Sequence, residues 1–398
     1  MLRLVLFFAG IAAIVTVAQG LLEPEDRVIR YNEPDHLADP ITVLQHRISA
    51  GEARLTFEPQ HGYLASLLRA LRVPVSSQNL VFSKTALQTE KVTPRTPRAI
   101  YFNDSVYVGW TPGGEAMDIT AVDPRKGPMF YTLDQKDASA PHFTRDMTCL
   151  RCHYGPKTLN VPGHLIRSVM TGPDGSPLGE VRQFSIGHGS AFADRWGGWY
   201  VSGRLQGDVH LGAAVTEQAF DPAKYLSPGS DIVALMVLAH QVKMDNLITH
   251  AKYEALFALD ARESPNPAWA KQRVAHAGDA LLDYMLFRDE APLRGPVQGS
   301  SSFARDFESR GPRDRQGRSL RDLDLRTRLF RYSCSYMIYS PAFDGLPANM
   351  KDYLWERLYT TLNGGAPTTM DRPDRVAVLE ILRDTKPEFA AWLRAHEH

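Results

Sequence analysis

The hydrophobic positions of this chain follow two different periods, one in each half. Between positions 98 and 133, short runs rich in β-branched and aromatic residues are separated by residues typical of turns. The runs are 99–102, 105–110, 118–122 and 129–133, and the turns between them are Asn103-Asp104, Pro112-Gly113-Gly114 and Pro124 to Gly127. This pattern predicts antiparallel hairpins. Runs at 165–170 and 180–186 on either side of Gly172 to Gly175 predict another hairpin.

The second half has the period of helices. Apolar side chains recur every three or four positions from Asp231 to Leu259, and Ser230 is the expected N-cap. Further helices are expected at 269–287, 348–362 and 375–395, and two short ones before the sheet at 40–50 and 61–71. Asp39 precedes the first of these as N-cap, with Pro40 in its first turn. The Gly-, Pro- and charge-rich stretch 289–324 is expected to be a surface excursion, and 325–339 to return to the core.

These patterns predict an α+β fold, in which a β-rich half made of antiparallel hairpins is followed by an α-helical half. The expected division is 21–225 for the first half and 226–398 for the second, with a boundary near Asp221 to Gly229. The two halves are expected either as separate domains or as one packed unit.

The N-terminal segment, residues 1–20, has the pattern of a secretory signal peptide. Arg3 supplies the positive charge, Leu4 to Ala18 is almost entirely apolar, and Ala18-Gln19-Gly20 offers small residues for cleavage. We therefore expect a periplasmic or otherwise exported protein, with an uncleaved membrane anchor as the alternative. No later stretch is expected to span a membrane.

Composition excludes some classes of partner. Lys and Arg together number 45 and so do Asp and Glu, which gives no general case for binding nucleic acid or an anionic membrane. The chain has 3 cysteines. Cys334 stands alone in an apolar and aromatic segment and is expected to be a small buried core residue.

The other two cysteines carry the main chemical signal. Cys149, Cys152 and His153 form a C-x-x-C-H sequence, the attachment signature of a c-type haem. Two thiols at this spacing can form thioethers with the two vinyl groups of one porphyrin, and the adjacent imidazole of His153 then becomes the proximal iron ligand. A zinc site would need a second Cys or His pair at similar spacing, and a thioredoxin-like pair would need a cytosolic βαβ context. We therefore expect one covalent haem c.

The second axial ligand decides what such a haem does, because two protein ligands favour electron transfer and an open position permits small-molecule chemistry. His188, between two glycines after an expected strand, is the first candidate for the distal ligand, and His210, in another Gly-flanked turn, is the second. His164 ranks lower. His240 and Met244 share a face of the long helix and, like Met170, are expected more often as packing residues.

Several other residues have two interpretations. The Gly- and aromatic-rich stretch 195–212 fits either strands whose backbone approaches a flat group or a twisted sheet with Gly bulges and an aromatic core. Arg182, Arg195 and Arg204 could serve acid–base roles, although pairing with a haem propionate or a carboxylate is preferred for at least one of them. Tyr154 is expected to be an aromatic wall of the haem pocket.

Beyond the haem motif, four further segments carry a resemblance: Arg98 to Asp104, Arg195 to Val201, Gly317 to Arg321 and Cys334 to Ser340. With them, most of the chain resembles the large exported bacterial proteins described as cytochrome c domain-containing, a family without an assigned reaction. The resemblance implies covalent haem at Cys149 and Cys152 with His153 on the iron, and no catalytic residues. The family has His-x-Gly-Asn where this chain has Ala213 in place of the Asn.

Three functions are consistent with these observations. The first is an exported monohaem c-type cytochrome in periplasmic electron transfer, with a redox partner protein docked on the helical half. The second is a haem enzyme of peroxidase or oxidase type with an open distal site, so a haem-dependent oxidoreductase. The third is a haem-based sensor or binding protein without turnover.

Overall fold

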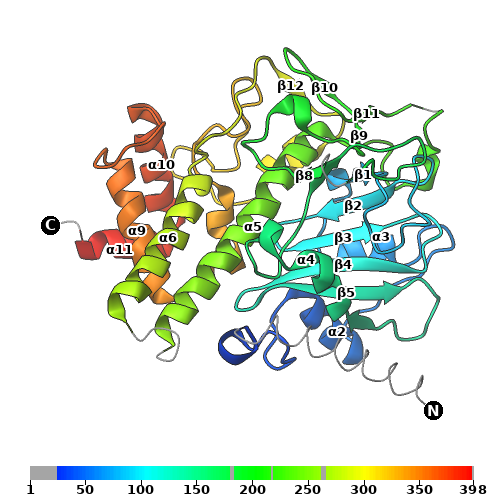
Figure 1. Cartoon of the computed structure of the whole chain (residues 1–398), viewed down its shortest axis with the longest axis horizontal. Coiled ribbons are helices and arrows are strands. Elements are labelled where there is room, and N and C mark those ends of the chain that lie inside the picture. The colour runs from blue at the N-terminus through cyan, green and yellow to red at the C-terminus, as the bar shows by residue number, and fades with distance from the viewer. Residues whose placement is uncertain (1–24, 180–182, 217, 261–265, 397–398) are drawn as a thin grey trace, which may run out of the picture.

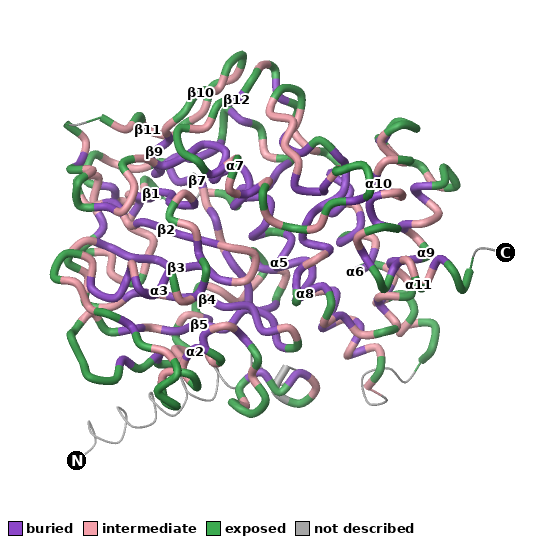
Figure 2. The backbone as a smooth tube through the Cα atoms, turned by 180° about the vertical axis from the view of Figure 1, so that it is seen from behind, coloured by how far each residue is buried: buried purple, intermediate pink, exposed green. Residues whose placement is uncertain are grey.

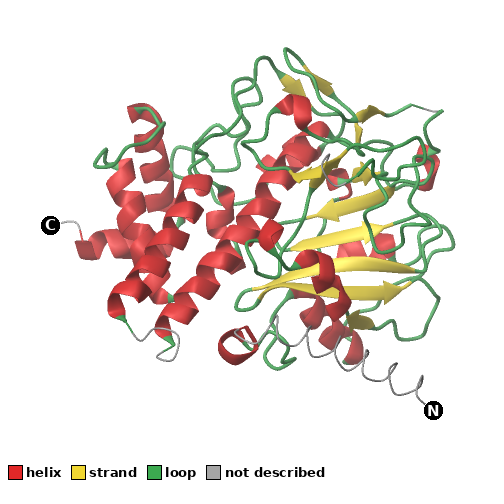
Figure 3. Cartoon of the chain, viewed as in Figure 1, coloured by secondary structure: helices red, strands yellow, loops and turns green. Residues whose placement is uncertain are grey.

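The computed structural model describes residues 25–179, 183–216, 218–260 and 266–396. The expected signal segment at 1–20 and Arg182 lie outside the described residues. The fold is α+β, as the sequence predicted: an antiparallel sheet occupies the N-terminal half and helices occupy the C-terminal half (Figure 3).

The main sheet is a six-stranded antiparallel meander in the order β1-β2-β3-β4-β5-β6. Its strands are β1 Asn79–Val81, β2 Arg98–Phe102, β3 Val106–Trp110, β4 Ala116–Asp123, β5 Gly127–Asp134 and β6 Phe143–Arg145. The four long strands coincide with the four apolar runs of the sequence. Their turns form where Asn, Gly and Pro interrupt those runs; Asn103, for example, accepts hydrogen bonds from the amides of Ser105 and Val106.

Each face of this sheet has its own helical cover. Tyr101, Val108, Ile119 and Tyr131 stand in register on one face and belong to a hydrophobic cluster shared with α2, Pro40–Ser49, and α3, Leu64–Ala70. Both helices form where the sequence predicted, and Asp39 caps α2 by accepting from the amides of Ile41 and Thr42. The opposite face carries Phe102, Tyr107, Thr120 and Phe130 and looks toward the long helix α5, Ile232–Leu259.

Helix α5 lies between the sheet and the C-terminal helices (Figure 1). It is buried along most of its length, as a helix that is apolar on all sides must be (Figure 2). By length and composition alone α5 could cross a membrane, and 94% of its most apolar window is buried inside the protein. Its N-cap is Asp231 and not Ser230, because the Ser230 hydroxyl instead accepts a hydrogen bond from the Leu80 amide of β1.

The C-terminal helices beyond α5 are α6 Pro267–Met285, α7 Phe303–Glu308, α8 Pro341–Asp344, α9 Ala348–Leu362, α10 Arg372–Thr385 and α11 Pro387–His396. Of these, α6, α7, α8 and α9 pack on α5, and α10 and α11 pack on α9 and on each other. The single helix expected at 375–395 is two helices, because Pro387 has no backbone N–H and starts a new helix after Lys386. One hydrophobic cluster runs from Val81 and Phe102 of the sheet through α5 to Leu393 of α11, so the core continues across the boundary expected near 221–229.

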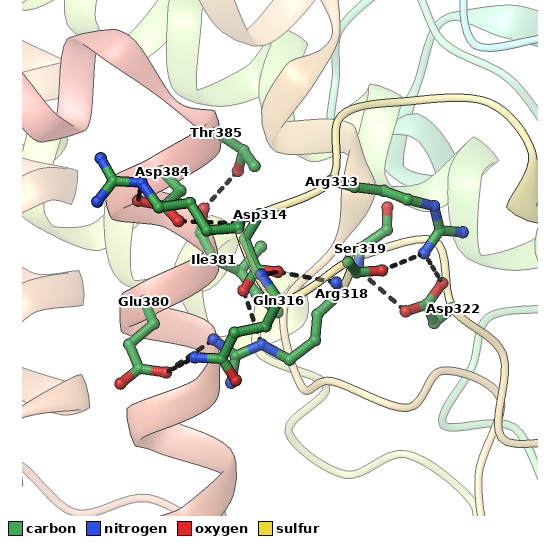
Figure 4. Close-up of polar contacts among 12 residues, drawn as sticks. Arg313, Asp314, Gln316, Arg318, Ser319, Asp322, Glu380, Ile381, Asp384 and Thr385 are labelled. Atoms are coloured by element: carbon green, nitrogen blue, oxygen red, sulfur yellow. Dashed lines mark hydrogen bonds and ion pairs between the residues drawn. The ribbon is translucent and has the colours of Figure 1, made fainter.

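The stretch 289–324, expected on the surface, enters the core instead. Phe303 and Phe307 are buried on α7, and Leu320 and Arg321 are buried beyond it. The loop that follows α7 is fixed to α10 by polar contacts (Figure 4): Arg318 pairs with Asp314 in its own loop and with Glu380 on the helix, each at 2.7 Å. The charged residues that suggested an exposed loop therefore form ion pairs that bind the loop to α10.

Smaller strands follow the haem motif. β7 Arg167–Val169 and β8 Gln183–Ser185 form the expected hairpin. The stretch 195–212 is mostly turns, with only β9 Tyr200–Val201 and β10 Arg204–Leu205, and β11 Ala213–Ala214 just after it. Its glycines approach protein backbone: a Cβ on Gly197 would lie 2.9 Å from the Val169 carbonyl oxygen. Trp196 beside them is fully buried, which fits the aromatic-core interpretation of this stretch.

Candidate haem-attachment site

The C-x-x-C-H sequence forms a short helical segment immediately after the edge strand β6. Asp146 caps its first turn by accepting a hydrogen bond from the Thr148 amide at 2.9 Å, and α4, Leu150–His153, follows. Leu150 is buried and anchors the segment. The thiols of Cys149, half-buried, and Cys152, exposed, are both free. Two thiols three positions apart therefore lie about one helical turn apart. Burial raises the pKa of the Cys149 thiol to about 12, whereas Cys152 is exposed.

His153 is held by a reciprocal pair of hydrogen bonds with Gly163. Its Nδ1 atom lies 2.9 Å from the Gly163 carbonyl oxygen, and the Gly163 amide donates to the His153 carbonyl oxygen at 2.8 Å. A carbonyl can only accept, so Nδ1 carries the proton and Nε2 keeps its lone pair. Within the part of the chain that the structure describes, Nε2 has no hydrogen-bond partner. This is the arrangement in which a histidine is ready to bind a metal through Nε2.

The surroundings of His153 combine an aromatic wall with charge. The ring of Phe130 on β5 lies 4.9 Å from the imidazole, centroid to centroid. Burial lowers the pKa of His153, while the hydrogen bond to Gly163 opposes that shift. The effect of burial is the larger, so the pKa of His153 lies below its ordinary value and the imidazole is neutral near pH 7. Neutral imidazole is the form that binds iron.

A paired arginine and aspartate lie on the same sheet face as Phe130. Arg98 on β2 forms an ion pair with Asp118 on β4, over Gly109, whose missing side chain makes room for the guanidinium. Both charges act on His153, since Arg98 lowers its pKa and Asp118 raises it. This part of the sheet face is only half-buried at Ile100, Asp118 and Thr132, so it is not closed off by the helices on that side.

His164 directly follows Gly163, whose carbonyl oxygen accepts the Nδ1 proton of His153. Its ring is 5% exposed and packs 4.2 Å from Tyr107, and neither ring nitrogen has a hydrogen-bond partner among the described residues. Its Nδ1 lies 3.7 Å from Oδ2 of Asp245, too far for a hydrogen bond. Burial lowers the pKa of His164 to about 3 and raises that of Asp245 to about 8. Both groups are therefore neutral near pH 7, and the contact is not an ion pair.

His188 and His240 form a buried pair with each other. Their Nδ1 atoms lie 3.0 Å apart, and their outer nitrogens contact Arg288 O at 3.3 Å and Ser335 Oγ at 2.7 Å. Because His188 Nε2 must donate to a carbonyl, its Nδ1 accepts from His240. Both nitrogens of His188 are thus hydrogen-bonded inside the protein. The His188 ring stacks on Tyr284, and the His240 ring stacks on Phe287. The structure brings His188 to His240 and not to His153.

The other candidates for the distal position are also separate from His153. His210 packs edge-on against Trp196 at 5.2 Å, and its Nδ1 accepts from the Gly212 amide. That segment adjoins β9, which continues beyond the β1 edge of the sheet, whereas the motif follows β6 at the opposite edge. Strand spacing of about 4.8 Å puts these two edges on the order of 20 Å apart.

The remaining predicted site residues have structural roles. Met244 is fully buried in the α5 core, and Met170 is partly exposed on the β7–β8 hairpin. Arg195 is buried over the Phe192 ring and donates to the carbonyl oxygens of Ser190 and His188, so backbone groups take the place of the expected carboxylate or propionate. Arg204 is exposed. Tyr154 is half-buried and packs against the hydrophobic cluster that the sheet shares with α2 and α3.

Two cavities lie away from the motif. One, of about 800 Å³, opens beside α10 and is lined by Glu290, Arg328, Arg331 and Asp374 among others. Arg328 bridges Glu290 at 3.2 Å and Asp374 at 3.5 Å, so its charge is already neutralised by the protein. The second, of about 330 Å³, lies between α6 and α9. Neither includes a motif residue.

The residues present fit a covalently held haem on its proximal side: two free thiols at the required spacing, and an imidazole whose Nε2 has no hydrogen-bond partner among the residues that the structure describes. The described residues include no group of three or more His, Cys, Asp and Glu side chains that could hold a metal ion directly. Two residues that hold His153 or its neighbour were not predicted from the sequence. Gly163 lies in the Val161-Pro162-Gly163 turn, which the sequence did show, whereas Asn246 lies in an apolar helix that gave no signal for it.

Comparison of the chain with protein-family models, with curated proteins and with solved structures found no match.

Proposed function

We propose that this chain is an exported monohaem c-type cytochrome that acts in periplasmic electron transfer. One observation carries the proposal: His153 Nδ1 donates to Gly163 O at 2.9 Å, and within the described residues its Nε2 has no hydrogen-bond partner, in the same helical segment as two free thiols. In this proposal Cys149 and Cys152 hold the porphyrin as thioethers and His153 binds the iron. A haem bound there would supply one-electron chemistry.

The chain's own residues would then set the environment of that group. Gly163 orients the imidazole, Phe130 packs against it, and the Arg98–Asp118 pair lies on the half-buried sheet face nearby. The exposure of Cys152 leaves the motif accessible to a redox partner protein. Export is proposed from residues 1–20 alone, as is cleavage of that segment.

A second candidate is a haem enzyme of peroxidase or oxidase type, or a sensor, with an open distal position. A specific observation favours it over a six-coordinate carrier. His188 and His240 are hydrogen-bonded to each other, and His210 packs against Trp196. Among the described residues, no hydrogen bond or ring contact joins His153 to a distal candidate that the sequence offered.

The experiment that tests the proposal is expression of the full chain with a haem-attachment system, followed by mass spectrometry of the purified protein. We expect one covalent haem per chain, and its loss or single-thioether attachment in Cys149→Ala and Cys152→Ala. Cys334→Ala is the matched control, since Cys334 is a buried free thiol that should not affect attachment. A folded wild-type chain without covalent haem would overturn the proposal.

The absorption spectrum of the loaded protein then separates the two candidates. A low-spin spectrum in both oxidation states supports electron transfer with two protein ligands. A high-spin ferric spectrum supports an open position, and peroxide turnover or reversible binding of carbon monoxide would then distinguish the enzyme from the sensor.

A further inference from the structure

Asn246, near the middle of α5, holds the backbone of His164 at both of its polar groups. Its Oδ1 accepts from the His164 amide at 2.8 Å, and its Nδ2 donates to the His164 carbonyl oxygen at 2.9 Å. Asn246 is 5% exposed, so both hydrogen bonds are shielded from water. A side-chain amide that pairs with one residue in this way fixes the position of the chain at that residue.

Gly163 fits between this amide and the preceding turn because it has no side chain. A Cβ on Gly163 would lie 2.6 Å from Oδ1 of Asn246 and 2.8 Å from Cβ of Thr158. The Thr158 hydroxyl in turn donates to the Val161 carbonyl oxygen at 2.7 Å and closes the turn from the other side. The 163–164 backbone is therefore held between α5 and the turn that follows the haem motif.

This backbone is the same one that holds His153. The Gly163 carbonyl accepts the Nδ1 proton, and the Gly163 amide binds the His153 carbonyl oxygen. A short path thus leads from the Asn246 amide through the 163–164 backbone to the imidazole. Because α5 is buried along most of its length, the Asn246 side chain projects from a closely packed, rigid helix.

We propose that Asn246 is the positioning residue for the axial histidine of this protein. This inference rests on the proposed function. By fixing Gly163, Asn246 keeps the Nδ1 proton of His153 in a good hydrogen bond, which sets the ring orientation and makes Nε2 a stronger donor to iron. Stronger donation favours the ferric state. Weakening the hydrogen bonds between Asn246 and His164 should therefore raise the reduction potential of the iron.

The test compares Asn246→Leu with Asn79→Leu. Asn79 is a matched control because it is also a fully buried Asn whose Nδ2 donates to backbone carbonyls, those of Gln78 and Asp231, on β1 at the far edge of the sheet. If Asn246→Leu does not fold, Asn246→Asp keeps the acceptor for the His164 amide and removes the amide donor. It is compared only in the protein without haem, because its charge would itself shift the reduction potential, and there it should give a smaller change.

Two readouts use the protein without haem. Amide hydrogen exchange at His164 should accelerate about tenfold or more in Asn246→Leu, because its acceptor is lost. Nitrogen NMR of His153 should show the Nδ1–H tautomer in the wild-type protein and a mixture of tautomers in the variant. The control should match the wild type in both. These measurements remain informative if no haem attaches, which would defeat the proposed function separately.

Two further readouts use the loaded protein. The Nδ1 proton of His153 should exchange faster with solvent in Asn246→Leu, and the reduction potential should rise. A tenfold change in the redox equilibrium corresponds to 59 mV for one electron. The inference is overturned if the tautomer, the Nδ1 exchange rate and the potential are the same in Asn246→Leu as in Asn79→Leu.

Discussion

Asp245 accepts a hydrogen bond of 2.5 Å from the Tyr107 hydroxyl through one carboxyl oxygen, while its other oxygen has no partner among the described residues. The hydroxyl of Tyr107 also accepts from Gln241, which accepts from Tyr336. Polar groups on α5 thus form a buried chain between the sheet and the segment 336–339. The carboxyl at its end is a buried titratable group whose pKa burial raises.

Stability should respond to pH through Asp245. Burial raises its pKa to about 8, against about 4 in an unfolded chain. Between these values the folded state holds a proton that the unfolded state lacks, so this contribution to stability is complete below about pH 4 and is lost as pH rises through about 8. Asp245→Asn removes the titration and keeps an acceptor for Tyr107.

We expect the free energy of unfolding of the wild type to fall relative to Asp245→Asn by up to about 1.4 kcal/mol per pH unit between pH 4 and 8. Urea unfolding of both proteins at pH 5, 6, 7 and 8 measures this difference. Comparing the two proteins cancels the opposite contribution of His164, whose lowered pKa destabilises the fold as pH drops from about 6.5 toward 3. Parallel pH profiles would contradict the assignment.

Substitution of the predicted distal ligands should separate ligation from packing. His188→Gln should leave the axial-ligand bands of the loaded protein unchanged, because both His188 nitrogens are bonded within the protein. It should lower the free energy of unfolding by about 1–3 kcal/mol, since His240 loses its acceptor in a buried site. His210→Ala should change neither property. A new spin state in either variant would restore that histidine as the distal ligand.

Thiol reactivity should differ sharply between Cys152 and Cys334 in the protein without haem. Cys152 is exposed, whereas Cys334 is fully buried, and burial raises the pKa of its thiol. Because the thiolate is the reactive form, iodoacetamide at pH 8 should modify Cys152 in the native protein and Cys334 only in denaturant. Peptide mapping by mass spectrometry would show the order; rapid native labelling of Cys334 would contradict its burial.

Two adjacent residues at the start of α5 should differ in their contributions to stability. Asp231 caps the helix through the amides of Val233 and Ala234, and its other oxygen binds the amides of Ser300 and Ser301 at 2.7 Å each. Asp231→Ala should cost about 3 kcal/mol of unfolding free energy, and Ser230→Ala about 1 kcal/mol. Chemical denaturation measures both. Equal losses would mean that the cap is not the dominant contact.

Local pattern was sufficient for much of this protein. The four long strands, the helices α2, α3, α5, α6 and α9, and the α+β order follow from hydrophobic period and turn residues, because these act within a few positions of the chain. The haem motif is equally local, since its chemistry depends on a spacing of three and four residues. The same local rules failed at Ser230 and at 289–324, where contacts with distant segments decided the outcome.

Tertiary structure alone decided which histidine meets which partner. The sequence placed His188 and His240 some fifty positions apart, and folding brings their Nδ1 atoms to 3.0 Å in the core. It also places Asn246 against the turn that holds His153, across a sequence separation of 82 positions from His164. Side-chain pairing across such distances depends on how α5 packs on the sheet. No periodicity or spacing within one segment encodes that packing, because it is fixed by the combined burial of both halves.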